Sequence, residues 1–216
     1  YIAKNYDIDE NKIKVIEHGV DTKIFDFKEK SREDIFTLMY SGAIVDSYDF
    51  DLILNAAAHL KEQKIKFIIR GKGELKKYIL EKINEEKLTN VIMDDTMVPF
   101  EEISTVLSKA DVFLIPMRDE KILNMSLPTK ILEYQAIGRP IICCSTGATG
   151  NFIEKTKSGF SLEYGDVEKF IKCIIKLKEN PELCKEMGRN GRMFVEENLT
   201  FEKIGNRLSE TIETLE

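Results

Sequence analysis

The sequence predicts an α/β domain with a Rossmann-like, doubly wound parallel sheet, followed by extra C-terminal helices. Two observations support this fold class. Short apolar runs alternate with segments of helical periodicity from residue 35 onward, which is the pattern of a parallel sheet covered by helices on both faces. Three more helical segments then close the chain, separated by clear breaks. Because crossovers between parallel strands are right-handed, the alternation gives a doubly wound sheet.

Each predicted strand is a short apolar run, and each predicted helix has apolar residues at helical spacing. The predicted strands cover residues 36–40, 66–69, 91–93, 112–115 and 140–144. The helices between them cover residues 50–63, 74–87, 101–109 and 128–137. After the segment 159–162, to which no element is assigned, we expect helices over 167–179, 181–198 and 201–215.

The first part of the chain is predicted to be a junction to another domain. Val15-Ile-Glu-His-Gly-Val-Asp21 is expected to end a strand in a glycine turn, and residues 28–34 form a polar connector. The chain also begins at Tyr1 rather than at a methionine. We therefore expect an interdomain junction over 1–34, the main domain over 35–200 and a terminal helix over 201–216, all within the C-terminal half of a longer enzyme.

Composition disfavours several functional classes. The 216 residues carry a formal net charge of −6 with acidic and basic residues interspersed, whereas nucleic-acid binding requires a basic surface. No apolar run approaches the ~20 residues of a membrane span, and no signal peptide is visible. The four cysteines lack metal-ligand spacing, and Asp94-Asp95 is interpreted as a loop pair. We expect a cytoplasmic protein without a metal site.

The segment 126–140 carries the strongest functional signal. It is predicted to be a loop, a helix and a turn into a buried strand, with Pro128 in the first helical turn and Gly138 at the helix end. The free N–H groups of a helix N-terminus bind anions. Lys130 in the first turn opposes the helix dipole, which a bound anion would offset. Glu133 stands among apolar neighbours, so its carboxylate is either exposed on a side face or directed at a polar ligand such as a ribose.

The pattern P-x-K-x-x-E-Y-x-A-x-G-x-P-I-I over residues 128–142 resembles the donor site of retaining glycosyltransferases of family 4 (group 1), which have the GT-B fold. The resemblance implies the donor-binding domain of an enzyme that transfers a hexosyl or N-acetylhexosaminyl group. The donor would be a nucleoside diphosphate sugar, with UDP or GDP as the nucleotide, and the acceptor a hydroxyl. The helix N-terminus with Lys130 would face the diphosphate, and Glu133 would bond the ribose. The resemblance implies no metal ion or other cofactor.

The resemblance also assigns donor contacts to the loops that follow the predicted strands. Backbone groups near Val98 would read the base, and the loop before residue 130 would contact sugar and phosphate. The residues alone leave simpler interpretations open: turn glycines, solvated cations, a capping threonine and a loop serine. The expected donor-binding set is Gly42, Arg70, Gly71, Lys72, Gly73, Val98, Arg118, Ser126, Leu127, Pro128, Thr129, Lys130 and Glu133. Gly147-Ala-Thr-Gly150 is interpreted either as a rim of the same cleft or as a plain loop.

Three positions depart from the family pattern. An arginine and a lysine are expected where the sequence has Ala43 and Tyr48, and a first glutamate is expected where it has Met125. Two alternatives therefore stay open. One is a non-catalytic nucleotide-sugar-binding relative or interaction module. The other is an enzyme like UDP-N-acetylglucosamine 2-epimerase, which would carry more acidic and histidine residues than this chain has.

The acceptor is expected to be a glycan or a lipid-linked molecule bound by the missing N-terminal domain, which would also make any membrane contact. By analogy with the family, the full-length protein would act in surface polysaccharide or glycolipid synthesis, peripherally at the inner face of the cell membrane. The 216-residue chain alone is expected to bind nucleotide without turning over.

Overall fold

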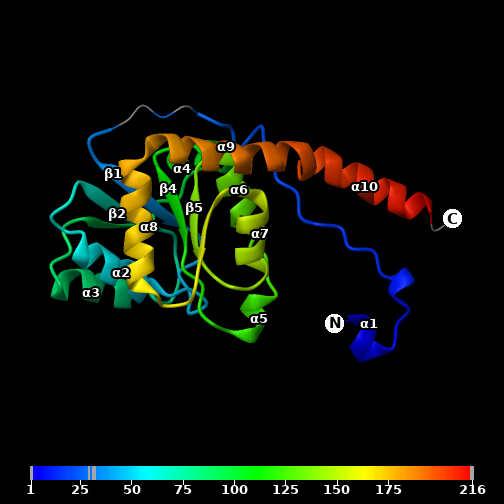
Figure 1. The fold of residues 1–216 in the computed structure, drawn as a ribbon, viewed down its shortest axis with the longest axis horizontal. Coiled ribbons are helices and arrows are strands. Elements are labelled where there is room, and N and C mark those ends of the chain that lie inside the picture. Colours follow the sequence, from blue (N-terminus) through cyan, green and yellow to red (C-terminus); the bar gives the residue numbers. More distant parts are fainter. Residues whose placement is uncertain (1, 29, 31–32, 215–216) are drawn as a thin grey trace.

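The strands form one parallel sheet in the order β3-β2-β1-β4-β5-β6 (Figure 1). The computed structural model describes residues 2–28, 30 and 33–214. The reversal of strand order lies between β1 and β4, the position at which doubly wound sheets bind ligands beyond the carboxyl ends of their strands. The strands are β1 (Phe36–Ser41), β2 (Ile65–Arg70), β3 (Val91–Asp94), β4 (Val112–Ile115), β5 (Ile141–Cys144) and β6 (Gly159–Leu162).

Helices cover both faces of the sheet, and alternate strand residues supply the two cores. Leu38 and Leu114 face the core beneath α2 (Phe50–His59), α3 (Lys76–Glu85) and α8 (Val167–Glu179). Met39 and Phe113 face the opposite core. That second core is covered by α4 (Ile103–Leu107), α6 (Lys130–Ile137), α7 (Ala148–Thr156) and α9 (Pro181–Asn198). The predicted Rossmann-like class is confirmed, and all five predicted strands are present within one or two residues.

Three elements within the predicted main domain, residues 35–200, were not predicted from the sequence. Residues 159–162 form the edge strand β6, and the loop before the key helix contains the single turn α5 (Lys121–Asn124). The plain-loop interpretation of 147–150 is wrong, because α7 begins at Ala148. Its glycines hid the helix: a Cβ on Gly150 would lie 1.9 Å from the Ser145 carbonyl oxygen, so close packing rather than flexibility explains that glycine.

Several predicted helix boundaries shift. Helix α2 ends at His59 rather than at residue 63, and α3 covers Lys76–Glu85 rather than 74–87. Pro128 lies outside the key helix, because α6 begins at Lys130 and Pro128 accepts a turn hydrogen bond from the Ile131 N–H at 3.1 Å. The helix predicted from residue 101 begins as the 3₁₀ turn η2 (Phe100–Glu102) before α4.

The N-terminal segment differs from the expected strand ending. Among the described residues, 13–19 form no strand, and Val20 makes an isolated parallel bridge to Thr200. Val20 and Phe25 are buried in the second core, so this part of the predicted junction packs on the domain. Parts of the connector 28–34 and the predicted helix end at Leu215 lie outside the described residues.

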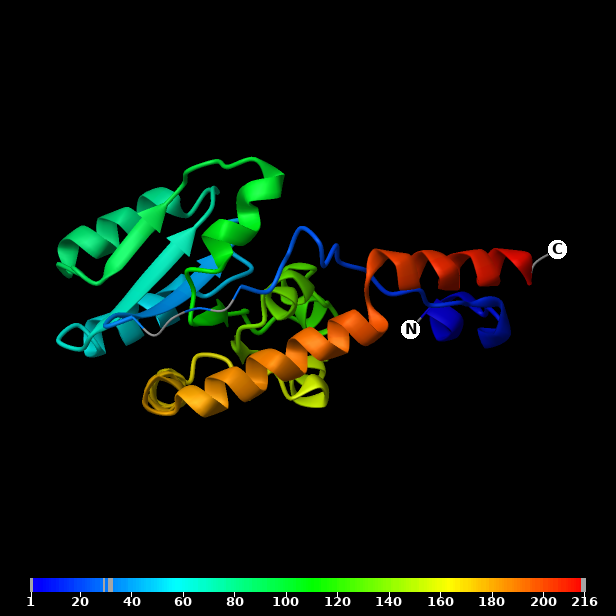
Figure 2. The same cartoon turned by 90° about the horizontal axis from the view of Figure 1, so that it is seen from above.

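Both terminal segments extend from the same side of the domain (Figure 2). They contain α1 (Ile2–Tyr6), the 3₁₀ turn η1 (Glu10–Lys12) and α10 (Phe201–Glu213). An ion pair of 3.3 Å joins Arg207 of α10 to Glu17. In the described part of the chain, no helix combines the length and apolar character needed to cross a membrane.

Candidate donor-binding site

Helix α6 is fixed to the end of β1 by Tyr134. The Tyr134 hydroxyl donates to the Ser41 carbonyl oxygen at 2.7 Å and accepts from the Ser41 N–H at 2.8 Å. Its ring stacks on Phe113 of β4, with centroids 3.9 Å apart and planes 5° from parallel. These contacts place the N-terminal half of α6 at the reversal point of the sheet, where the family resemblance expects the donor.

The Lys130 ammonium lies over the end of β1. Its Nζ donates to the Tyr40 hydroxyl at 3.0 Å and is 4.3 Å and 4.1 Å from the ring centroids of Tyr40 and Tyr48. Burial lowers the pKa of Lys130 to about 8, and the neighbouring Glu133 carboxylate partly opposes that shift. A lysine with a pKa this low is a candidate functional group, because such shifts cluster at binding sites.

Glu133 lies half-buried one turn after Lys130 on the same helix. Burial raises the pKa of its carboxyl, while the Lys130 charge opposes this rise. Among the described residues, its carboxylate accepts no hydrogen bond from a side chain or backbone N–H. A partly buried carboxylate with free acceptor oxygens can accept hydrogen bonds from the hydroxyls of a ribose.

The backbone at the start of α6 offers free donors. The N–H groups of Ile131 and Leu132 donate to the carbonyl oxygens of Pro128 and Thr129 at 3.1 and 2.9 Å. Within the described chain, the N–H groups of Thr129 and Lys130 have no acceptor. Thr129 occupies the N-cap position but makes no capping hydrogen bond through its side chain. The structure therefore brings free N–H groups and an ammonium to one end of α6, where an anion is favoured.

The three predicted glycines pack backbone against backbone at this point. Gly42 and Gly71 have φ values of +149° and +142°, and a Cβ on Gly71 would lie 1.8 Å from the Gly42 carbonyl oxygen. A Cβ on Gly73 would lie 2.1 Å from the Ile44 carbonyl oxygen. A Cβ on Gly42 would lie 2.4 Å from Lys130 Nζ. Close contact with neighbouring backbone therefore accounts for Gly71 and Gly73, whereas Gly42 also makes room for the ammonium.

Arg70 and Arg118 are paired with carboxylates of this chain. The buried Arg70 lies 3.4 Å from Asp94 and donates to the Thr96 carbonyl oxygen at 2.7 Å. Arg118 lies 3.3 Å from Asp46 at the surface. The Arg70 contacts hold the loop that leads to the half-buried Val98, so Arg70 supports the segment assigned to base recognition. Lys72 is exposed beside this loop.

The loop before α6 is braced by the start of α7. The Ser126 carbonyl oxygen accepts from the Thr149 hydroxyl at 2.8 Å, and the Ser126 hydroxyl donates to the Leu123 carbonyl oxygen at 2.9 Å. A Cβ on Gly147 would meet the Asn124 carbonyl oxygen at 2.2 Å. Gly147 and the first turn of α7 therefore lie against the predicted sugar-contacting loop, and their interpretation as a rim of the donor cleft stays a prediction.

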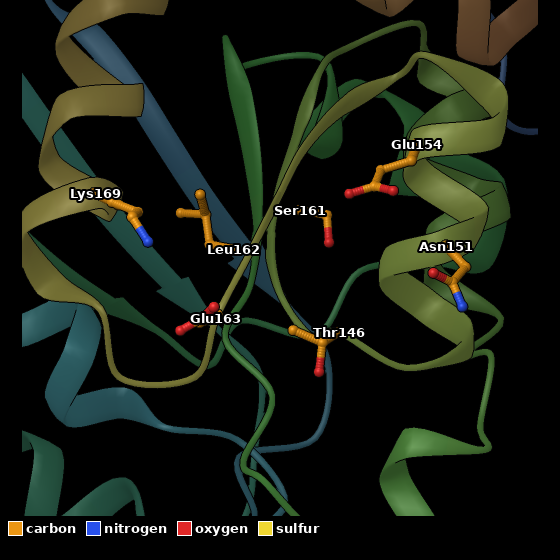
Figure 3. Close-up of a pocket in the computed structure, with 7 residues that line it drawn as sticks. All are labelled: Thr146, Asn151, Glu154, Ser161, Leu162, Glu163 and Lys169. Atoms are coloured by element: carbon orange, nitrogen blue, oxygen red, sulfur yellow. The ribbon is translucent and has the colours of Figure 1, made fainter.

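Two surface pockets lie near the candidate site, one at the edge strand β6 and one beyond the carboxyl ends of β4 and β6. The first is built from β6 and the adjoining ends of α7 and α8 (Figure 3), and its lining residues are Thr146, Asn151, Glu154, Ser161, Leu162, Glu163 and Lys169. The second contains Arg118 together with Asp49, Asp119 and Glu120. Neither pocket includes Lys130 or Glu133. Their carboxylates are unsuited to a diphosphate, so we place the candidate site at α6.

The sequence-based set omitted two residues that organise this site. Tyr40 ends an apolar strand and reaches Lys130, and Tyr134 follows directly after Glu133 in the key pattern. A signal for both existed, since a buried tyrosine usually requires a partner for its hydroxyl. The partner itself comes from a distant element and could not be identified from the sequence.

Comparisons with known proteins identify the family. The family model described as "Glycosyl transferases group 1" matches residues 21–194. An uncharacterized glycosyltransferase of Methanocaldococcus jannaschii is 24% identical over 85% of this chain and 49% of its own length. An Escherichia coli UDP-Gal:alpha-D-GlcNAc-diphosphoundecaprenol alpha-1,3-galactosyltransferase is 26% identical over 82% of this chain and 48% of its own length. The chain spans about half the length of the curated relatives it matches.

Solved structures agree with the fold. Sucrose-phosphate synthase from Thermosynechococcus elongatus superposes with a TM-score of 0.79 at 17% identity, over 94% of this chain and 52% of that one. Anabaena HepE in complex with UDP and glucose gives a TM-score of 0.76 at 15% identity, over 93% and 57%. The sheet order, the position of α6 and the family match lead to one conclusion: the chain belongs to the group 1 glycosyl transferases.

Proposed function

We propose that this chain is the donor-binding domain of a retaining glycosyltransferase that uses a nucleoside diphosphate sugar. The observation that carries the proposal is the convergence of the Lys130 ammonium, the free N–H groups of Thr129 and Lys130 and the Glu133 carboxylate at the N-terminal end of α6. Cationic and N–H donors suit a diphosphate, and the unpaired carboxylate suits a ribose.

The N-terminal end of α6 would stabilise the charge that develops during sugar transfer. As the bond between sugar and diphosphate breaks, negative charge grows on the departing diphosphate. Fixed donors directed at developing charge lower the barrier, because they need no reorganisation during the reaction. Lys130 and the helix N–H groups would supply this stabilisation, and Glu133 would hold the nucleotide through its ribose. The positive charge would come from the protein itself rather than from a metal ion.

The acceptor lies outside the proposed role of this chain. A hydroxyl acceptor, glycan or lipid-linked, would be presented by a further domain of a longer protein, and sugar transfer would need both. The E. coli relative is named for a diphosphoundecaprenol-linked substrate and UDP-Gal, and HepE was solved with UDP. These names support a UDP-sugar donor and a role in surface glycan or glycolipid synthesis, with a hexosyl group as cargo. The family match favours the transferase over the epimerase alternative.

Calorimetric titration of the chain with UDP, GDP and ADP tests this function. We expect one nucleotide to bind, UDP most strongly of the three, and both Lys130→Ala and Glu133→Ala to weaken it by about tenfold or more. Thermal unfolding of each variant checks that the fold survives. If no nucleotide binds a folded chain, the donor-binding role is wrong and the non-catalytic interaction module becomes the better account.

A further inference from the structure

Tyr48 is held in place before any ligand arrives. Its backbone forms an isolated antiparallel bridge with Met117 just beyond β4. Its ring packs against Tyr40 with centroids 5.1 Å apart and planes at 64°, and against Phe50 at 6.4 Å. Tyr40 is fixed in turn by donating its hydroxyl proton to the Ala43 carbonyl oxygen. We call Tyr40 and Tyr48 the tyrosine cage, because the Lys130 ammonium lies against both rings.

The cage holds a cation without neutralising it. Arg70 and Arg118 each face a carboxylate, Asp94 and Asp46. In contrast, the ammonium of Lys130 forms no ion pair within the described residues. Its nearest partners are neutral rings and one hydroxyl, and the Glu133 carboxylate acts on it only at longer range. Burial raises the pKa of both cage tyrosines, so the phenols stay uncharged. Attraction to ring faces orients an ammonium and leaves its charge available to an anion.

The site has an alternative source of positive charge. The family resemblance leads one to expect basic side chains where this sequence has Ala43 and Tyr48. The space beside Gly42 is instead occupied by the ammonium of Lys130, which approaches from α6. The ring at position 48 therefore lies against Lys130, the cation of the pattern over residues 128–142, at a position where a second basic side chain is expected.

We propose that Tyr48 is a positioning residue: with Tyr40 it fixes the Lys130 ammonium beside Gly42, so that one lysine from α6 serves the diphosphate in place of the usual basic side chains. This inference rests on the proposed function. It gives Tyr48 a role in holding the remaining cation of the site, whereas decay of the site would leave position 48 without any relation to Lys130.

The first test compares a Tyr48 variant that keeps the aromatic ring with one that removes it. Tyr48→Phe keeps the ring face and should bind UDP within about threefold of wild type, whereas Tyr48→Leu should weaken UDP binding by about 3- to 30-fold. UMP serves as the second ligand. A positioning role lowers the ratio of UDP to UMP affinity, while general damage to the fold lowers both affinities together and leaves their ratio unchanged.

Charge relocation provides the second test. Lys130→Met removes the cation, and combining it with Tyr48→Lys returns a cation to almost the same space, since the Tyr48 ring centroid lies 4.1 Å from Nζ. We expect the double variant to bind UDP about tenfold more tightly than Lys130→Met alone. Rescue would show that a cation supplied from position 48 serves the same anion as Lys130, and a double variant no tighter than Lys130→Met would contradict the shared position of the two charges.

A matched control comes from another lysine and aromatic pair. Lys155 of α7 lies 5.7 Å from the ring centroid of Phe194 of α9, outside the candidate site. Phe194→Leu should leave the ratio of UDP to UMP affinity unchanged. If wild type binds UDP and Tyr48→Leu keeps the wild-type ratio, the cage proposal is overturned while the donor site stands. If folded wild type binds none of UDP, GDP and ADP, the proposed function fails first and the cage proposal with it.

Discussion

The hydroxyl of Tyr134 bonds to both backbone groups of Ser41, at 2.7 Å to the carbonyl oxygen and 2.8 Å to the N–H. Ser41 is the last residue of β1, next to Gly42, and Tyr134 follows Glu133 on α6. One side chain therefore sets the distance between the strand end and the helix that carries the candidate donor contacts. The geometry of the candidate site therefore depends on Tyr134, whose hydroxyl bonds the backbone of Ser41 rather than a ligand.

Tyr134→Phe should lower the free energy of unfolding by about 1–3 kcal/mol, because the Ser41 groups lose their partner in a partly buried place. Urea unfolding measures this change. Tyr78→Phe is the control, since the Tyr78 hydroxyl bonds the exposed Asp51 carboxylate at 2.7 Å; its effect should stay within about 0.5 kcal/mol. Equal stability of the two variants would show that the Ser41 contacts contribute nothing.

Gly42→Ala should damage both stability and nucleotide binding. The new Cβ would lie 2.4 Å from Lys130 Nζ, and a φ of +149° disfavours a side chain. We expect a loss of about 1–3 kcal/mol from backbone strain. Gly205→Ala is the matched control, because nothing lies within 4 Å of that position in α10; it should be neutral or stabilise by up to about 1 kcal/mol. A Gly42→Ala protein with wild-type UDP affinity would exclude a tightly fitted ammonium at this point.

Most strands of the sheet could be predicted from the sequence, whereas the contacts that build the candidate site could not. Alternating apolar runs predicted β1 to β5, because buried parallel strands are apolar on both faces. The edge strand β6 was missed, since Gly159 and Ser161 interrupt its apolar character. The key helix was predicted from its own residues. The ion pairs of Arg70 and Arg118, and the cage around Lys130, join segments that are distant in sequence, so no local pattern reveals them.

Nucleotide affinity should fall as the pH rises through about 8. Lys130 carries a pKa lowered by burial to about 8 in the free chain, so its charge is present below that pH and lost above it. The groups that face its ammonium are Tyr40, Tyr48 and Glu133. Both tyrosines have raised pKa values and stay neutral through this range. Calorimetry between about pH 6.5 and about pH 9.5 measures the effect.

The control for this pH profile is Lys130→Met, which should bind UDP weakly with little change across the same range. The folding stability of the chain depends on the Lys130 titration in the opposite direction to UDP affinity. Its pKa is lowered in the folded state, so the unfolded chain binds more protons, and stability rises with pH between about 8 and the ordinary lysine value of about 10.4. If UDP affinity rose together with folding stability as the pH increased above about 8, the assigned role of the ammonium would be contradicted.

Glu133→Gln should weaken the binding of UDP by about tenfold or more. The reason is that a charged acceptor for the two ribose hydroxyls becomes a neutral amide. The loss should be smaller for 2′-deoxy-UDP, which offers one hydroxyl fewer. Glu168→Gln, an exposed carboxylate on α8 within 3.8 Å of Lys172, provides the control and should leave both affinities unchanged. Equal losses for UDP and its deoxy form would place Glu133 away from the 2′-hydroxyl.

The most direct test of the donor site is an NMR titration of the Lys130 ammonium, in protein labelled at lysine, without and with saturating UDP. The signal is assigned by its absence from Lys130→Met. In the free chain we expect a pKa of about 8. Bound UDP should raise the pKa, because a nearby diphosphate stabilises the charged form. An unchanged pKa in a chain that demonstrably binds UDP would contradict the central claim that this ammonium faces the diphosphate.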